Sequence, residues 1–419
     1  MTRTLRRDIE VIFNAALEPV RAGDAVRAHL AIADDGHVIV GGQQIEIGEV
    51  GVYAIAIGKA SVTMVDAAAE RIGERFTAGL AVSKAESPSQ NPKVSALLGS
   101  HPVPDGRSLA AGEAVLRFAH EVPDGAVVMC LISGGGSSLV EDLCDGVDLD
   151  RLRELTSGLL RAGASIHELN AVRSRLSRIK AGGLMRALSH ARVYNLIVSD
   201  VLGDDLQTIA SGPTVPPLDS DAEAVMRRFG MPGTLPSLRE QRALPMPPTT
   251  VVANLSIALD SAAKMAVELG YEPIVLTRSL DGEAREVGRL LASIVADGAT
   301  GKASFGRRSC VLAGGETTVT VRGDGTGGRN TEAALAAAMR LSGVGDVALG
   351  FLATDGDDGT TGAAGAIVDG STVAAVERGD ALDALQRNDS YRFLRTREAI
   401  LKTGPTGTNV NDLAIGLIG

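Results

Sequence analysis

The apolar residues of this chain follow two alternating patterns, short continuous runs and runs spaced as in an amphipathic helix. Continuous runs at 52–58, 126–132 and 192–199 are typical of buried strands, and each is followed by a loop that contains glycine. Helix-spaced segments separate the runs. This alternation predicts an α/β fold with a parallel sheet covered by helices on both faces, and with functional loops at the carboxyl ends of the strands.

The second half of the chain shows a different strand pattern. Further strands are expected at 250–255, 272–277, 309–313 and 346–353, while Thr317, Val319 and Val321 alternate as in a β-hairpin. A mixed sheet follows from this pattern. Half of the 16 prolines lie between residues 212 and 249, so we expect two domains, 1–238 and 239–419. We allow for contact of the last segment, 403–419, with the first domain.

The first twenty residues predict a helix that docks on the protein. Three arginines are present, as in a signal peptide, but acidic and polar residues interrupt any apolar run. Apolar residues recur instead at helical spacing, at Leu5, Ile9, Ile12, Ala16 and Val20. No stretch of 18 apolar residues occurs in the chain, so a membrane partner is not expected.

Composition limits the functions open to this protein. The 419 residues carry a net charge of −10, which argues against wrapping nucleic acid because a polyanion needs a basic surface. With 45% hydrophobic and 22% charged residues the chain can bury a full core. Its 3 cysteines form no CxxC pair, so neither a disulfide framework nor a zinc site is indicated. A reducing, cytoplasmic location is expected.

Two loops of the first half are candidates for anion binding. Lys59 follows the strand 52–58 and opens a helix expected at 60–72, where a cation opposes the helix dipole unless an anion is nearby. The loop SGGGSS follows the strand 126–132, and its amides and hydroxyls suit a phosphate; it comprises Ser133, Gly134, Gly135, Gly136, Ser137 and Ser138. The alternatives are a surface lysine and a plain strand-to-helix turn.

Polar side chains further along could complete a site. On a helical wheel of 167–183, Asn170, Arg173, Ser177 and Lys180 form a stripe beside the apolar one, as a cleft wall would. An exposed basic helix is the alternative. Asp200 closes the strand 192–199, where a carboxylate can hold Mg²⁺, accept a substrate proton or cap a turn.

The second half offers a second cation and more carboxylates. Arg329 opens an Ala-rich helix at 331–340, after the spelling GxGxxG at Gly323, Gly325 and Gly328. A dinucleotide fingerprint should follow an apolar strand, and here TTVTVRG precedes it. Together with Lys59, Arg329 suits neutralisation of a transferring phosphoryl group.

Three further loops of the second half carry polar groups. Glu316 ends a strand, an Asp-rich loop runs from 354 to 361, and hydroxyls and amides cluster at 403–412. The Asp-rich loop offers carboxylates for a metal or forms a plain turn. The 403–412 loop contacts a ligand or caps a short helix.

Nine blocks, in order, carry a family resemblance: GKA (58–60), HPVPD (101–105), SGGGSS (133–138), LNAVRSRLSRIKAGGL (169–184), SDVLGDD (199–205), SGPT (211–214), GGETTVTVRGDGTGGRN (314–330), TDGDDGTTGAAGA (354–366) and TGPTGTNVNDL (403–413). The chain resembles the class II glycerate kinases, the glycerate 2-kinase family whose C-terminal half is the MOFRL domain. The resemblance implies a Rossmann-like N-terminal domain, a smaller MOFRL domain, and ATP- and Mg²⁺-dependent phosphorylation of D-glycerate to 2-phosphoglycerate. Asp357 and Thr360 depart from the isoleucine and proline expected in many relatives.

On this basis the catalytic residues are expected to be Lys59 and Arg329, acting on the same phosphoryl group from the two domains. Arg173 or Lys180 is expected to hold the glycerate carboxylate, and Asn330, Thr406 and Asn409 to bind substrate or phosphate along with the SGGGSS loop. Asp200, Glu316 and Asp355 are candidates for Mg²⁺ or for the hydroxyl proton.

Two other functions stay open from the sequence. One is an NAD(P)H-dependent hydroxypyruvate reductase, and the other is a sensor of phosphorylated metabolites that does not turn over ATP. The oligomeric state is also open, with a homodimer as one alternative.

Overall fold

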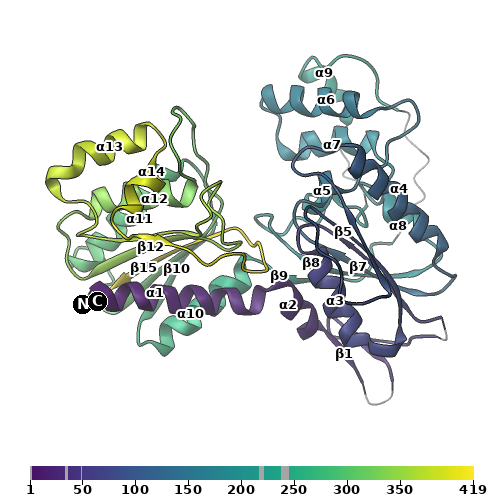
Figure 1. Ribbon diagram of the computed structural model, residues 1–419, viewed down its shortest axis with the longest axis horizontal. Helices are drawn as coiled ribbons and strands as arrows, with labels where there is room; N and C mark the ends of the chain where they lie inside the picture. Colours follow the sequence, from purple (N-terminus) through teal and green to yellow (C-terminus); the bar gives the residue numbers. More distant parts are fainter. Residues whose placement is uncertain (1, 34–35, 49, 217–220, 237–244) are drawn as a thin grey trace. The chain divides into compact units, whose positions relative to one another are not determined.

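A computed structural model describes residues 2–33, 36–48, 50–216, 221–236 and 245–419 (Figure 1). The chain divides into two compact units. One is Ala22–Val252, and the other combines Met1–Arg21 with Ala253–Gly419. Each unit is built on its own six-stranded sheet. The α/β class and the two sheets expected from the sequence are confirmed.

The sheet of the Ala22–Val252 unit has the strand order β6-β5-β4-β7-β8-β9, and its pairings from β6 to β8 are all parallel. This is the Rossmann order, in which the chain switches direction across the sheet between the first and fourth strands, here β4 and β7. The strands are β4 (Val52–Ile57), β5 (Phe76–Ser83), β6 (Val94–Leu98), β7 (Val127–Ile132), β8 (Arg192–Val198) and β9 (Thr249–Ala253).

Helices flank this sheet, and the unit also contains a smaller, separate antiparallel sheet. The latter consists of β1 (Leu30–Ile32), β2 (Val38–Val40) and β3 (Gln43–Ile45). The helices are α2 (Ala22–His29), α3 (Ser61–Ile72), α4 (Gly106–Glu121), α5 (Gly136–Leu139), α6 (Leu149–Arg161), α7 (Ile166–Leu176), α8 (Gly183–Ala187) and α9 (Ala222–Arg228). Leucines of α6 and α7 pack with α9 in a separate small core.

The sheet of the second unit is mixed, as expected, with the order β10-β11-β15-β12-β13-β14. Only β10 and β11 pair in parallel among these strands; the other described pairings are antiparallel. The strands are β10 (Glu272–Leu280), β11 (Ser309–Gly315), β12 (Val347–Ala353), β13 (Gly365–Asp369), β14 (Ile400–Leu401) and β15 (Asp412–Ile418).

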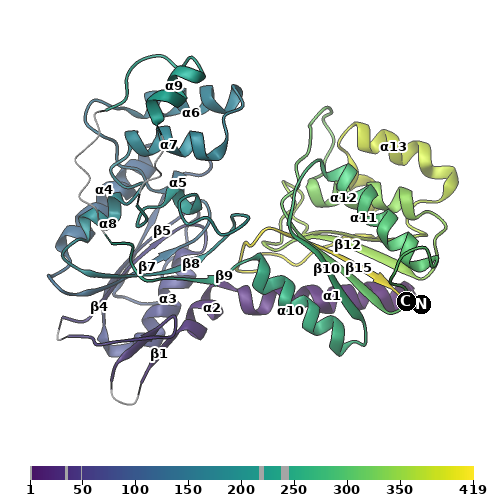
Figure 2. The same ribbon diagram turned by 180° about the vertical axis from the view of Figure 1, so that it is seen from behind.

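Helices cover both faces of this second sheet, as Figures 1 and 2 show. On one face lie α1 (Thr2–Leu17) and α10 (Leu255–Glu268), and on the other α11 (Ala284–Ala299), α12 (Arg329–Leu341), α13 (Arg378–Gln386) and α14 (Ser390–Arg395). The N-terminal helix docks as predicted, since Ile9, Ile12 and Ala16 are 0% exposed. None of the described helices has the length and apolar character that crossing a membrane requires.

Three expectations differ from the structure. The predicted domain boundary at 238/239 lies outside the described residues; the structure divides the chain after Val252 and assigns α1 to the second unit, because its apolar stripe is buried there. The predicted hairpin at 317–321 is absent among the described residues. The backbone amides of Glu316 and Thr318 bond instead to the strand end and loop at 280–282, and Val321 is 75% exposed.

The predicted helix 167–183 is also shorter than expected. The helix α7 ends at Leu176, and Ser177 is extended, with φ −114° and ψ 142°, where it forms a bridge to Leu143. The helical wheel drawn for residues 167–183 therefore does not predict where the side chain of Lys180 lies. Its side chain is placed by a turn and not by a helix face.

Candidate active site

Lys59 lies at the switch point of the parallel sheet, where a ligand crevice is expected in this kind of fold. Its backbone N–H donates to the carbonyl of Gly134 at 2.9 Å, and the N–H of Ala60 donates to Ser133 Oγ at 3.1 Å. The loop after β4 and the SGGGSS loop after β7 are thus joined directly. The structure brings together the two anion-binding candidates of the first half.

Gly135 lies beside both Lys59 and His101. Its φ of +81° is left-handed, and a Cβ there would meet His101 Cδ2 at 3.0 Å and Lys59 Cε at 3.3 Å. His101 therefore flanks the same loop as Lys59. Burial, followed by the charges of Lys59 and Lys84, lowers the pKa of His101, so the neutral imidazole is favoured. Sequence reasoning did not select His101, although its block HPVPD was part of the resemblance.

The SGGGSS loop presents amides without protein partners. Between Gly134 and Ser137 no backbone N–H donates to another residue of the described chain. Asp200 lies against this loop, since a Cβ on Gly134 would meet its Oδ2 at 1.9 Å. A loop with unpaired amides beside a lysine suits an anion, and the adjacent carboxylate suits a cation bound to that anion.

The hydroxyls of this loop connect to α7. Ser137 Oγ and Ser211 Oγ are 2.7 Å apart, and Ser211 Oγ donates to Asn170 Oδ1 at 3.2 Å. Arg173 Nη2 donates to the Ser137 carbonyl at 3.2 Å. Ser138, in contrast, donates within the loop to the Gly135 carbonyl at 3.3 Å. Asn170 and Arg173 thus reach the loop, as the predicted polar stripe requires.

Lys180 does not lie on that stripe. Its side chain is 1% exposed and forms an ion pair with Glu141, which is 0% exposed. Burial lowers the pKa of Lys180, and the charge of Glu141 opposes the effect. The charge that the sequence assigned to a substrate is therefore already paired within the protein.

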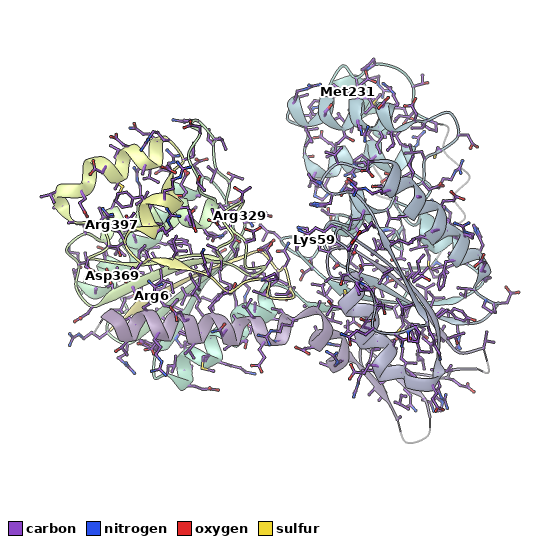
Figure 3. All side chains as sticks on the ribbon, viewed as in Figure 1. Arg6, Lys59, Met231, Arg329, Asp369 and Arg397 are labelled. Atoms are coloured by element: carbon purple, nitrogen blue, oxygen red, sulfur yellow. The ribbon has the colours of Figure 1, made fainter. Side chains whose placement is uncertain are left out.

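Arg329 lies beside the carboxyl ends of β11 and β12 in the second sheet. Asp412, the first residue of β15, pairs in register with Gly315 of β11 and Ala353 of β12, so the loops after β11 and β12 meet at its side chain. The Arg329 guanidinium donates to both Asp412 oxygens, with Nη2 3.1 Å from Oδ1, and Nη1 lies 2.9 Å from Glu316 Oε1. Figure 3 shows Arg329 in this unit.

Contacts with described residues occupy three of the five guanidinium N–H groups of Arg329, which leaves two for a ligand in this part of the chain. Burial opposes its charge, but the bonds to Asp412 and the nearby carboxylates outweigh that effect and raise the pKa of Arg329. Burial raises the pKa of Asp412 to about 6, against the opposing effect of Arg329. Arg329 is a fixed cation, and Asp412 is a carboxylate that titrates near neutrality.

Asp358 holds the first turn of α12 in place. Its carboxylate accepts the backbone N–H groups of Asn330 and Thr331, each at 2.8 Å, and Asn330 Nδ2 at 3.3 Å. Burial raises the pKa of Asp358, and these hydrogen bonds oppose the shift. The Asn330 side chain is 4% exposed and engaged with Asp358, so it supports the position of Arg329.

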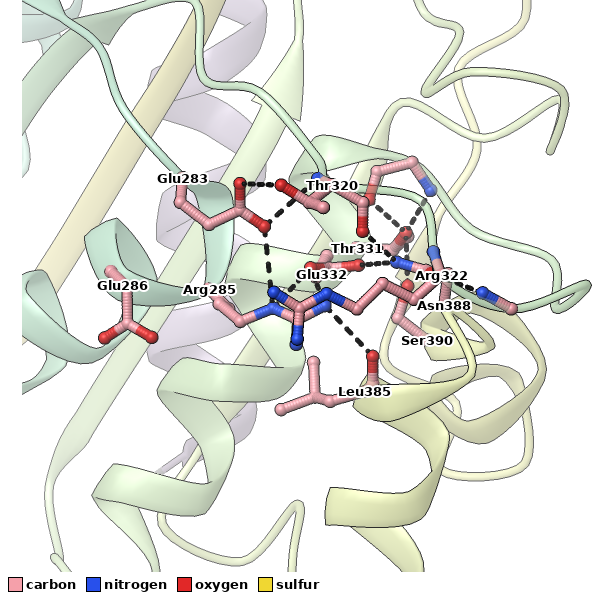
Figure 4. A network of polar contacts seen from close by, with 12 residues as sticks. Glu283, Arg285, Glu286, Thr320, Arg322, Thr331, Glu332, Leu385, Asn388 and Ser390 are labelled. Carbon is pink, nitrogen blue, oxygen red and sulfur yellow. Dashed lines mark hydrogen bonds and ion pairs between the residues drawn. The ribbon is translucent and has the colours of Figure 1, made fainter.

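The GxGxxG spelling is explained by packing. The Gly325 N–H donates to the Arg387 carbonyl at 2.9 Å, and a Cβ on Gly325 would lie 2.5 Å from that oxygen. The amides of Arg322 and Gly323 bond to Asn388 Oδ1, whose Nδ2 bonds to Glu332 at 3.0 Å (Figure 4). These amides are used within the protein and do not face a pyrophosphate.

The other predicted loop residues also make internal contacts. Asp355 accepts the backbone N–H of Asp357 at 3.0 Å. Thr406 Oγ1 donates to the Thr354 carbonyl at 2.5 Å, and Asn409 Oδ1 accepts the Asn411 N–H at 3.4 Å. The loops 354–361 and 403–412 are thereby held against each other beside Arg329.

The metal candidates do not form a ready-made cage. Within the residues that the structure describes, no three His, Cys, Asp or Glu side chains gather as a metal site would require. Asp200 lies in the first unit, while Glu316 and Asp355 lie in the second, where Glu316 is paired with Arg329. Magnesium in phosphoryl-transfer sites takes only one or two carboxylates plus phosphate and water, and Asp200 in the first unit and Asp355 in the second are each a ligand of the kind that this ion uses.

A cavity of about 330 Å³ lies at the opposite edge of the second sheet. It is lined by Ala348 and Asp369, which pair at the start of β12, and by Arg6 and Arg397. Arg6 bonds to Glu10 and to the carbonyls of residues 398 and 400, and Arg397 bonds to Glu377. Both arginines are therefore bonded to groups of the protein itself. The loops around Arg329 are the better candidate for a catalytic site.

Two family models match the chain. The family described as "Domain of unknown function (DUF4147)" matches residues 8–241, and the MOFRL family matches residues 309–412. Among curated relatives, the D-glycerate 2-kinase of Thermotoga maritima is 41% identical, with 88% of this chain and 90% of the relative covered. The glycerate 2-kinase of Pyrococcus horikoshii is 36% identical, with 96% and 95% covered.

A relative with another name and a solved structure complete the comparison. A putative hydroxypyruvate reductase of Agrobacterium vitis is 37% identical, with 87% of this chain and 86% of the relative covered. The crystal structure of a glycerate kinase from Thermotoga maritima is similar over 100% of both chains, with a TM-score of 0.87 and 36% identity.

Proposed function

This chain belongs to the glycerate 2-kinase family that carries a MOFRL domain, and on that premise we propose that it phosphorylates D-glycerate. In the reaction the C2 hydroxyl oxygen attacks the γ-phosphorus of ATP, the bond between that phosphorus and the bridging oxygen breaks, and the hydroxyl proton passes to a base. The products are 2-phosphoglycerate and ADP. The enzyme is a phosphotransferase with an alcohol acceptor.

The observation that carries this proposal is the joined pair of loops at the switch point of the first sheet. Lys59 lies next to the loop segment between Gly134 and Ser137, whose amides have no partner in the described chain. This combination suits the charge on a transferring phosphoryl group. Because the transition state of such a transfer is loose, positioning and electrostatics supply most of the catalysis. Asp200 and the neutral imidazole of His101 are the candidates for the proton acceptor.

Arg329 is proposed to act on the same γ-phosphoryl group from the other unit. Its two remaining N–H groups can bridge equatorial phosphate oxygens while Asp412 and Glu316 hold the guanidinium in place. Asn330, Thr406 and Asn409 contribute by keeping the loops around Arg329 in shape.

Magnesium is the expected companion of ATP, and the carboxylate proposed to hold it is Asp200 in the first unit or Asp355 in the second. When bound, the ion would neutralise phosphate charge. The cysteines Cys130, Cys144 and Cys310 are free and buried thiols, which fits the cytoplasmic location expected from the sequence.

The test is a coupled assay of ADP release over a panel of small hydroxy acids, followed by ³¹P NMR of the product. We expect turnover with D-glycerate and a phosphorus resonance coupled to the C2 proton. Coupling to the C3 protons would place the ester at the other hydroxyl, and an absence of ADP release with every acid would refute the kinase assignment.

A hydroxypyruvate reductase is the less favoured function. The glycine-rich loop that suggested a nicotinamide cofactor uses its amides to hold the segment 387–390. We therefore expect no loss of NADH absorbance when hydroxypyruvate is added to the enzyme.

A further inference from the structure

A buried ion pair lies directly behind the SGGGSS loop. One carboxylate oxygen of Glu141 accepts a hydrogen bond from the ammonium group of Lys180. The other accepts a hydrogen bond from the hydroxyl of Ser177, at 2.5 Å. The side chains of Lys180 and Glu141 are 1% and 0% exposed. Whether the proton is on the nitrogen or on the oxygen, the net charge of this pair is zero. Glu141 is therefore not available to neutralise a second cation fully.

Arg173 is that second cation. Its Nη2 donates to the Ser137 carbonyl at 3.2 Å, whereas its Nε is buried without a hydrogen-bond partner among the described residues. A neutral carbonyl does not compensate a full positive charge, and a buried unpaired donor is costly. Lys180, Glu141 and Arg173 together thus carry one net positive charge beside the loop.

The neutral groups around Arg173 suggest what supplies the missing negative charge. Ser137, Ser211 and Asn170 form a hydrogen-bonded chain along the same loop, and Asn170 and Ser211 are 4% and 2% exposed. Hydroxyl and amide groups of this kind bind ligand hydroxyls. A carboxylate with a neighbouring hydroxyl would satisfy both the charge and the polar chain.

We propose that Arg173 binds the carboxylate of the acceptor substrate, and that Lys180 is a positioning residue that neutralises Glu141 and so leaves the charge of Arg173 for the substrate. This inference rests on the proposed function. It separates two residues that the sequence treated as alternatives. Arg173 touches the substrate, and Lys180 acts through Glu141.

The decisive comparison is between Lys180→Met and the double variant Lys180→Met, Glu141→Gln. In the single variant Glu141 is released to pair with Arg173, so we expect KM for D-glycerate to rise about tenfold or more while KM for ATP stays unchanged. In the double variant Arg173 again has no anionic neighbour in the pair, so KM for D-glycerate should return to within about threefold of the wild type.

Arg175→Met is the matched control. Arg175 is on the same helix and pairs with Glu223 at 2.8 Å, away from the loop. It should leave both KM values unchanged. A cooperative thermal unfolding transition, measured for every variant, is the check that it is folded. A double variant that melts normally but keeps the raised KM of Lys180→Met would overturn the positioning role.

A second variant covers the case in which the buried pair cannot be changed without unfolding. Arg173→Met should lower the preference for D-glycerate over glycerol, which lacks the carboxylate, by about 10²-fold in kcat/KM. An unchanged preference in an active enzyme would overturn the carboxylate assignment. Wild-type enzyme without any kinase activity would instead refute the proposed function, so the two failures are distinguishable.

Discussion

Asp412→Asn should affect the activity and the stability of this enzyme in different ways. The ionised carboxylate of Asp412 holds Arg329 for catalysis, but its burial costs stability at high pH. Burial raises the pKa of Asp412 from 3.8 to about 6. The folded state therefore binds the proton more tightly than the unfolded chain, and the resulting stability is present below pH 3.8 and lost as the pH rises through about 6. At about 1.4 kcal/mol for each pKa unit, the loss amounts to about 3 kcal/mol above pH 6.

The asparagine cannot ionise, so it avoids this loss. The pH-dependent part of the stability should therefore be missing from Asp412→Asn: between pH 4 and pH 8 the free energy of unfolding of the wild type should fall by up to about 3 kcal/mol relative to that of the variant. Activity should change in the opposite direction. The asparagine oxygen can still accept one bond from Arg329, but the negative charge and the second bond, worth about 1.5–3 kcal/mol, are lost, so kcat should fall about 10- to 10²-fold at pH 8.

The assays are denaturant unfolding and steady-state kinetics between pH 4.5 and 8.5. In the wild type, kcat should fall as Asp412 becomes protonated below pH 6, and this decline should be missing from the variant. Asp369→Asn is the matched control, because Asp369 accepts bonds from Ser371 and Thr372 at the opposite edge of the same sheet. A variant with wild-type kcat across this range would refute the role given to Asp412.

Three further changes test other parts of the site. Lys59→Ala and Arg329→Ala should each lower kcat by about 10³-fold in a protein that still folds, and the loss of kcat in the double variant should be much smaller than the product of the two single losses; fully multiplicative losses would mean that the cations act separately. Gly135→Ala should keep the fold but raise KM for ATP, because the φ of +81° is strained for alanine and the added Cβ would press on His101 and Lys59; an unchanged KM would show that this loop does not contact the nucleotide. Asp358→Ala should lower the free energy of unfolding by about 1–3 kcal/mol in a urea titration, because two backbone amides lose their acceptor, and no loss would contradict its capping role.

The strands that carry the first site could be predicted from the sequence because they are continuous apolar runs. The observed strands β4 and β7 are wholly contained in the predicted runs 52–58 and 126–132 and differ from them by one residue. Because both faces of a parallel sheet are buried, nearly every residue of these strands is apolar. Lys59 and the SGGGSS loop follow such strands directly, and so their meeting at one edge was predictable.

Contacts between distant loops were not predictable in the same way. His101 reaches Lys59 and Gly135 from a loop after β6 whose sequence has no periodic pattern. Lys180 was placed by extrapolating the α7 helix past Leu176, but Ser177 leaves the helix to bond with Glu141. A side chain that ends a helix by a tertiary contact gives no local signal, because its partner is distant in the sequence.

The two helix-opening cations illustrate how differently the fold treats charges of the same sign. A cation near a helix N-terminus opposes the macrodipole. For Arg329 the fold compensates this effect with Asp412 and Glu316, which fix the guanidinium and leave two donors. The helix α3 after Lys59 has no acidic residue in its first turn and no side-chain cap, and Lys59 forms no ion pair with the described residues. A bound phosphate would supply a compensating anion for Lys59 beside the amides of the SGGGSS loop. Arg329 is therefore held in place by its own carboxylates, whereas Lys59 gains a strong anionic partner when phosphate binds.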